Sequence, residues 1–242
     1  MTHTIDQSQR RAARVVGLAY LAALVPAIFA EFYVPGQLIV YDDAAETARN
    51  IVAHERLFRL GIASSLIVFA MDVVLVTALY AVLERVDRNL ALLAAFFRLI
   101  ETTVLVVVTL NDLDVLRLLS GTEYLRVFEA DRLQALARLS IGAHGAAYNV
   151  GLLFFGFGSP VFCYLWLRSG YVPRALAAWG IIASLLVGAC ALAFIVFPGV
   201  AKVVTVAYYG GPMFLFELAI GLWLVFRGLR PSPVAERELV RA

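Results

Sequence analysis

The chain has 242 residues, of which 62% are hydrophobic and only 16% are charged, and its mean hydropathy is +0.85. Soluble domains are roughly 45–50% apolar and about 25% charged, so this composition excludes an ordinary soluble protein. The formal net charge of +2 is too small to indicate a nucleic-acid partner.

The apolar residues form blocks of about 20, which is the length a helix needs to cross the hydrocarbon core of a bilayer. The blocks predict an all-α, polytopic membrane helical bundle with about six transmembrane helices. We expect one transmembrane helical domain over residues 1–230 and a short cytoplasmic tail over residues 231–242. The predicted spans, in chain order, are 12–32, 57–83, 89–110, 139–167, 175–197 and 203–226.

The first span follows a polar start that carries Arg10, Arg11 and Arg14, which resembles the opening of a signal peptide. Its apolar run is long, however, and it ends at Glu31 and Phe32 rather than at a small-x-small cleavage motif. We therefore interpret this segment as an uncleaved first transmembrane helix.

Two segments between the spans are long enough to be helical themselves. Asp43, followed three residues later by Glu46, resembles a capping box and predicts an amphipathic helix ahead of the second span. Between spans three and four, a break at residues 120–122 precedes the segment 129–138, which carries leucines on one helical face. We expect both to be extracytoplasmic helical segments.

The arginines indicate how the bundle is oriented. With the N-terminus in the cytoplasm, the inner segments are short and basic, whereas the arginines of the outer segments are diluted by acidic residues. The positive-inside rule therefore favours cytoplasmic N- and C-termini. Trp166, Trp179 and Trp223 lie toward the predicted inner ends of their helices, where an aromatic belt is expected.

Charged side chains inside the spans are the strongest functional signal in the chain. One such charge costs roughly 2.5–3.5 kcal/mol at a helix centre, and it normally faces the bundle interior or a wet cavity. With a rise of ~1.5 Å per residue, Asp72, Arg98 and Glu217 each lie roughly 15 Å from the predicted inner ends of their helices. Three helices thus bring charge to the same depth near the bilayer midplane, which predicts a shared cluster.

Further polar residues lie on the outer side of this depth. Glu101 shares a helix face with Arg98 and lies one turn closer to the outside. We expect a salt bridge between Glu31 and Arg59 at the outer boundary. The inner half of the bundle has no comparable residues, so the pattern predicts a polar pocket open to the extracytoplasmic side. The candidate ligand-binding residues are Glu31, Arg59, Asp72, Arg98, Glu101, His144, Tyr148, Asn149 and Glu217.

The charge balance of the cluster is negative, because Asp72, Glu101 and Glu217 accompany one permanently charged group, Arg98. An uncompensated buried carboxyl group favours holding a proton or binding a cation. Such a site suits a general acid or base, a proton-coupling group or a ligand clamp, with Glu101, Glu217 and His144 as the candidate catalytic residues. A purely structural pairing of Asp72 with Arg98 is an equal interpretation.

The familiar enzyme and metal motifs are missing from the sequence. It has no P-loop, no Gly-x-Ser-x-Gly, no His-Glu-x-x-His and no Cys/His metal spacing. Its two cysteines, Cys163 and Cys190, both lie within apolar spans, which is unlike a disulfide framework. We therefore predict no metal site and no cofactor, and whether the protein is an enzyme stays open.

Several stretches resemble the bacterial integral-membrane family called domain of unknown function 4386. They cover residues 30–32, 38–51, 57–61, 92–101 and 148–156 and include Glu31, Arg59, Arg98, Glu101 and Asn149. The resemblance extends over about residues 14–227 and implies a multi-helix protein of the bacterial cytoplasmic membrane. It implies no activity, substrate or catalytic residue, because the family has none established.

Three functions fit the sequence. The first is a pocket that binds or acts on a small or lipophilic molecule. The second is a small proton-coupled transporter, an oligomer at this size, since midplane carboxyl groups are typical of proton coupling. The third is a structural or sensory membrane partner that uses its charges only for helix assembly.

Overall fold

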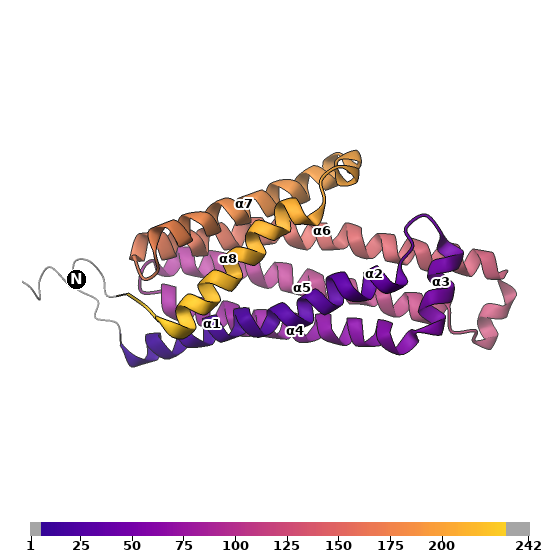
Figure 1. Ribbon diagram of the computed structural model, residues 1–242, viewed down its shortest axis with the longest axis horizontal. Helices are drawn as coiled ribbons and strands as arrows, with labels where there is room; N and C mark the ends of the chain where they lie inside the picture. The colour runs from indigo at the N-terminus through magenta and orange to yellow at the C-terminus, as the bar shows by residue number, and fades with distance from the viewer. Residues whose placement is uncertain (1–5, 231–242) are drawn as a thin grey trace, which may run out of the picture. The chain divides into compact units, whose positions relative to one another are not determined.

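The computed structural model describes residues 6–230, and these residues form helices without any strand (Figure 1). The predicted tail, 231–242, lies outside the described residues. The α-helices are α1 (Gln7–Ile28), α2 (Val34–Leu38), α3 (Ala44–Ala53), α4 (Glu55–Leu83), α5 (Arg88–Leu118), α6 (Ala130–Ser169), α7 (Arg174–Val196) and α8 (Val206–Phe226). A π-helix, η1 (Phe29–Tyr33), and two 3₁₀ turns, η2 (Glu123–Val127) and η3 (Pro198–Lys202), complete the described elements.

Six helical segments are long and apolar enough to cross a membrane, which confirms the predicted all-α membrane fold. The first is continuous from Gln7 to Leu38, through α1, η1 and α2. The others are α4, α5, α6, α7 and α8.

Two of these helices are longer than their apolar cores. α5 has 31 residues and α6 has 40, which correspond to about 46 Å and about 60 Å, against a hydrocarbon core of about 30 Å. The polar segments at 111–118 and 130–138 continue the helices, and hydropathy alone does not detect such extensions. The predicted break between the two helices is present, and Gly121 there adopts a φ of 66° that favours glycine.

The predicted amphipathic helix before the second span is α3. Its N-cap is Asp43, whose carboxylate accepts a hydrogen bond from the Glu46 N–H at 2.8 Å. Thr47, Ala48 and Ile51 form its buried face. The capping motif in the sequence therefore identifies the start of this helix correctly.

The π-helix η1 interrupts the first membrane segment directly after α1. The Val34 N–H donates to the Phe29 carbonyl, five residues earlier. Pro35 has no N–H, so it cannot donate the ordinary α-helical bond to the carbonyl of Glu31. The proline thus explains why the widened turn forms at residues 29–33.

The described chain divides into two compact units. Unit 1 comprises the residues up to Ala22, Met71–Thr102 and the residues from Asn149 onward, and unit 2 comprises Ala23–Ala70 and Thr103–Tyr148. Each unit has its own buried apolar core, with Trp166, Phe216 and Leu79 in unit 1 and Leu38, Ile51 and Phe58 in unit 2. All of α7 and α8 belong to unit 1, where they lie side by side (Figure 1).

Close backbone contacts hold unit 1 together. A Cβ on Gly156 of α6 would lie 2.4 Å from the Gly188 Cα of α7, and a Cβ on Gly17 of α1 would lie 2.9 Å from the Gly221 carbonyl oxygen of α8. Without a hydrophobic driving force between helices in lipid, such small residues permit the close packing that stabilises the bundle.

Polar contacts join helix ends at the side of unit 1 that we predict to be cytoplasmic. The fully buried Gln9 amide of α1 donates to the Val82 carbonyl at 2.8 Å and to the Tyr171 hydroxyl at 3.1 Å. Asp87 caps α5 and pairs with Arg168 of α6 at 3.0 Å. The Leu90 N–H and the Arg168 guanidinium hold the pKa of Asp87 below its usual range.

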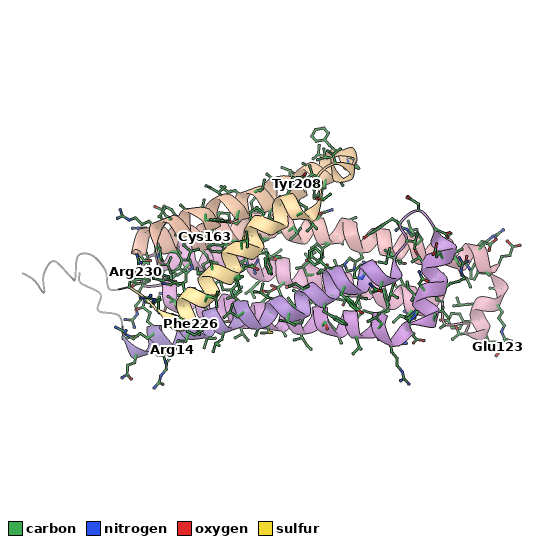
Figure 2. All side chains as sticks on the ribbon, in the orientation of Figure 1. Arg14, Glu123, Cys163, Tyr208, Phe226 and Arg230 are labelled. Carbon is green, nitrogen blue, oxygen red and sulfur yellow. The ribbon has the colours of Figure 1, made fainter. Side chains whose placement is uncertain are left out.

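The first and last spans of unit 1 have their polar ends close together. Gly17 of α1 packs against Gly221 and Leu224 of α8, and Figure 2 labels Arg14 of α1 and, at the end of α8 and just after it, Phe226 and Arg230. The Arg230 guanidinium lies 4.5 Å from the centre of the Trp223 ring. Trp166, in contrast, is only 1% exposed and packs in the core of unit 1.

Candidate functional site

Arg98 is the centre of a charged cluster in unit 1. Its guanidinium contacts Glu101 on the same helix, with an Nη1–Oε2 distance of 2.6 Å, and Asp72 of α4, with an Nη2–Oδ1 distance of 3.5 Å. The side chains of Arg98 and Glu101 are 5% and 4% exposed, and that of Asp72 is 16% exposed. The sequence placed these three residues near one another, and they meet in the structure.

The close contact between Arg98 Nη1 and Glu101 Oε2, at 2.6 Å, is a buried ion pair. Among the described residues, neither atom has a hydrogen-bond partner besides the other. Buried polar atoms are nearly always hydrogen-bonded, because leaving one unpaired costs about 1–3 kcal/mol and more for a charged group. The ion pair offsets part of that cost, and each atom can bond one further group, because Arg98 Nη1 carries a second N–H and Glu101 Oε2 a second lone pair.

Two half-buried residues complete the cluster. Glu217 of α8 and Tyr20 of α1 both interact electrostatically with Arg98. The guanidinium also lies 4.5 Å from the centre of the Phe155 ring of α6, which is a cation–π contact. Four helices of unit 1 thus contribute to the surroundings of this one α5 arginine.

Gly158 permits α6 to approach Arg98. A Cβ at this position would lie 2.9 Å from the Ala94 carbonyl oxygen and 2.9 Å from the Arg98 Cγ. On the other side, the Thr102 hydroxyl donates to the Arg98 carbonyl at 2.9 Å. The arginine is therefore held in place by packing as well as by charge.

A second polar group lies in unit 2. His144 Nδ1 of α6 lies 3.0 Å from an Asp112 carboxylate oxygen of α5, and the His144 ring stacks on Tyr148 with centroids 5.9 Å apart. Glu31, in the π-helix η1, interacts electrostatically with both His144 and Asp112. Asp112 lies in the part of α5 that continues beyond the predicted third span.

The remaining candidate residues are Arg59 and Asn149. Arg59 is exposed and pairs with Glu55 one turn earlier, with an Nε–Oε1 distance of 2.6 Å. The expected salt bridge from Arg59 to Glu31 is therefore wrong, because an i,i+4 partner on its own helix is available. Asn149 is half-buried at the start of the α6 segment of unit 1.

Comparison with known families identifies the chain. The profile described as "Domain of unknown function (DUF4386)" matches residues 15–228. The chain belongs to this family. The match confirms the resemblance noted in the sequence, and no curated protein or solved structure matches this DUF4386 member.

Two shallow grooves occur in unit 1 of this DUF4386 protein. One, of about 390 Å³, is lined by residues of α7 and by Pro212 of α8. The other, of about 350 Å³, lies between α1 and α4 and is lined by Ala12, Val15, Val73, Val74, Thr77, Ala78 and Ala81. Both linings are uncharged, so neither groove is the polar pocket expected from the sequence.

The described residues of this family member contain no group of three histidine, cysteine or acidic side chains arranged to hold a metal ion. Sequence reasoning did not identify Tyr20, Asp112 or Phe155 as neighbours of the charged groups. Tyr20 had a detectable signal, because counting residues along the first span places it about as deep as Arg98. Phe155 had none, since aromatic residues are common throughout the spans.

Proposed function

We propose that this protein binds a small lipophilic molecule within the membrane and that the Arg98 cluster of unit 1 anchors the polar end of that molecule. The observation that supports this most directly is the remaining hydrogen-bonding capacity of Arg98 Nη1 and Glu101 Oε2, two buried atoms that have no partner besides each other among the described residues. A bound group that accepts from the guanidinium and donates to the carboxylate adds one hydrogen bond to each atom and lowers the cost of their burial.

The charge of the cluster defines the chemistry of the anchored group. Asp72, Glu101 and Glu217 outnumber Arg98, so a hydroxyl group, which both donates and accepts, is favoured over a carboxylate or a phosphate. Glu101 or Glu217 exchanges a proton with the bound molecule in this proposal, and the polar end enters from the extracytoplasmic side.

The apolar part of the ligand has an uncharged surface available on the two helices that also carry Tyr20 and Asp72. Val73 and Val74 of α4 line a groove between α1 and α4. The groove is shallow and open, with a volume of about 350 Å³, so an apolar body lying in it keeps one side in contact with the surrounding lipid. A lipophilic body in this groove is consistent with a polar end at Asp72.

Proton-coupled transport is the second candidate, and the excess of carboxyl groups over arginine supports it. Both functions need a ligand at the same cluster. They differ in whether the bound molecule is carried from one face of the membrane to the other.

The test compares the molecules that copurify with two variants of the full chain. We expect the amount of the bound molecule, measured by mass spectrometry after solvent extraction from nanodiscs, to fall at least about tenfold in Glu101→Gln, since one lost charge-assisted hydrogen bond contributes about 1.5–3 kcal/mol. Glu123→Gln, at an exposed position of η2, is the matched control and leaves the amount unchanged.

Thermal unfolding of both variants separates binding from folding. If Glu101→Gln retains its full complement of copurified molecules, or if it only lowers the unfolding temperature, the binding proposal is overturned. Loss of the molecule with unchanged unfolding of the emptied protein supports it.

A further inference from the structure

The polar group of unit 2 is independent of the Arg98 cluster and of the function proposed for it. Its members come from three elements: Glu31 from the π-helix η1, Asp112 from α5 and His144 from α6. All three belong to unit 2, whereas the members of the Arg98 cluster belong to unit 1.

His144 is held in a defined orientation. One ring nitrogen, Nδ1, is 3.0 Å from the Asp112 carboxylate, and one ring face stacks on Tyr148 at an interplanar angle of 13°. A carboxylate at Nδ1 keeps a proton on that nitrogen. The second nitrogen, Nε2, is then the atom at which the ring gains or loses its other proton.

The charges around the ring favour an added proton. Burial of the ring disfavours its charged form, whereas Asp112 and Glu31, the charged groups that interact with His144, are both acidic and favour it. A protonated imidazolium is attracted to both carboxylates, whereas a neutral ring keeps only the hydrogen bond to Asp112.

We propose that Glu31, Asp112 and His144 form a proton-binding site in unit 2. Histidine changes charge between about pH 5 and pH 8, so the occupancy of this site responds to physiological pH. The side chains of His144 and Asp112 are 25% and 16% exposed at the surface of the protein, so the site is not sealed within the helices.

The π-helix supports this assignment. Glu31 is the middle residue of η1, and a widened turn changes the direction of the side chains that follow relative to an unbroken α-helix. Single π-turns are frequent at functional sites, because they cost stability and are kept where they place a side chain usefully. Here the turn carries the second carboxylate of the site.

A metal ion does not explain the group. Within the described residues, Glu31, Asp112 and His144 are not arranged to hold one. Binding a proton requires only one basic nitrogen with acidic groups nearby. His144 provides the nitrogen, and Asp112 and Glu31 provide the acidic groups.

The test follows the exchange of each histidine ring's C2 hydrogen for deuterium as a function of pH, in the full-length protein in nanodiscs. This rate reports ring protonation separately for His144 and for the exposed His54, whose Nδ1 faces only the Asn50 carbonyl. In the wild type we expect different pH profiles for the two residues. We expect Asp112→Asn to move the His144 profile by about one pH unit or more toward that of His54.

Two controls show whether a change in the His144 profile is specific to the site. The His54 profile must stay the same in wild type and variant, and Glu31→Gln must move the His144 profile in the same direction as Asp112→Asn. In Asp112→Asn, the asparagine oxygen still accepts the hydrogen bond from the His144 ring, so the variant removes mainly the charge. If Asp112→Asn does not fold, the His144 profile of Glu31→Gln alone tests the proposal. The proposal is overturned if His144 and His54 titrate alike in the wild type, or if neither variant moves the His144 profile.

Discussion

Arg98 combines three properties that membrane helices seldom combine: it is charged, almost fully buried and incompletely hydrogen-bonded. Removing one partner of a buried ion pair is more costly than removing an exposed one, because the other partner keeps its desolvation cost without compensation. The loss of unfolding free energy on replacing Arg98 should therefore exceed the loss on replacing an arginine of a surface salt bridge.

We expect Arg98→Met to lower the free energy of unfolding by about 3–5 kcal/mol, because it leaves Asp72 and Glu101 without a counter-charge. Arg59→Met, which removes the exposed pair with Glu55, should cost about 1 kcal/mol or less. Unfolding with sodium dodecyl sulfate in mixed micelles measures both. The double variant Arg98→Met/Asp72→Asn should recover part of the loss, and equal effects of Arg98→Met and Arg59→Met would contradict a buried pair.

The meeting of Asp72, Arg98 and Glu101 could be predicted because a helix rises by a constant distance per residue. Counting depth requires no knowledge of how helices pack. The partner of Arg59 could not be predicted in the same way, since it depends on which of two nearby acids, Glu31 or Glu55, the side chain meets. Asp112 was not identified as a neighbour of His144, because the apolar pattern of the third span ends at residue 110 whereas α5 continues to Leu118.

At the level of elements, the sequence predicts the existence and order of the helices but not their details. The capping motif at Asp43 identifies the start of α3 because a local hydrogen bond decides it. The π-turn at η1 could not be predicted, since one extra residue in a turn leaves the apolar pattern almost unchanged. Contacts such as that of Gly156 with Gly188 depend on tertiary packing, which residue spacing does not reveal.

The contact between α6 and α7 makes Gly156 sensitive to a single methyl group. Gly156→Ala would place a Cβ 2.4 Å from the Gly188 Cα, where backbone atoms on both sides have no room to move. We expect it to lower the free energy of unfolding by about 1–3 kcal/mol, which detergent-based unfolding measures.

Gly145→Ala, on the same helix, is the matched control. A Cβ there meets no atom within 4 Å, so alanine should leave stability unchanged or raise it by up to about 1 kcal/mol through its higher helix propensity. Similar behaviour of the two variants would show that the close contact is not important for stability.

At the scale of the whole molecule, six helices of sufficient length and the DUF4386 match agree on a multi-pass membrane protein. The orientation follows only from the distribution of arginines and is a prediction. The division into two units could not be predicted from hydropathy, because α4, α5 and α6 each contribute residues to both units without a break in their apolar pattern.

Cysteine labelling tests the orientation. In a chain whose Cys163 and Cys190 are replaced by alanine, we introduce Glu123→Cys or Arg174→Cys, both at exposed positions near helix ends. We expect a membrane-impermeant maleimide to label Glu123→Cys in intact cells and Arg174→Cys only after lysis. The opposite pattern would place both termini outside the cytoplasm.

The contact of Gly156 with Gly188 also constrains how a ligand reaches the Arg98 cluster. Where two helix backbones touch, no acyl chain fits between them, so α6 and α7 form a lipid-tight seam at this level. A molecule in the bilayer therefore cannot diffuse laterally between α6 and α7 at the level of this contact. A ligand that enters from the lipid would have to pass between a different pair of helices. The open groove between α1 and α4 is one such place, and its lining includes Val73 and Val74, which follow Asp72 in the sequence.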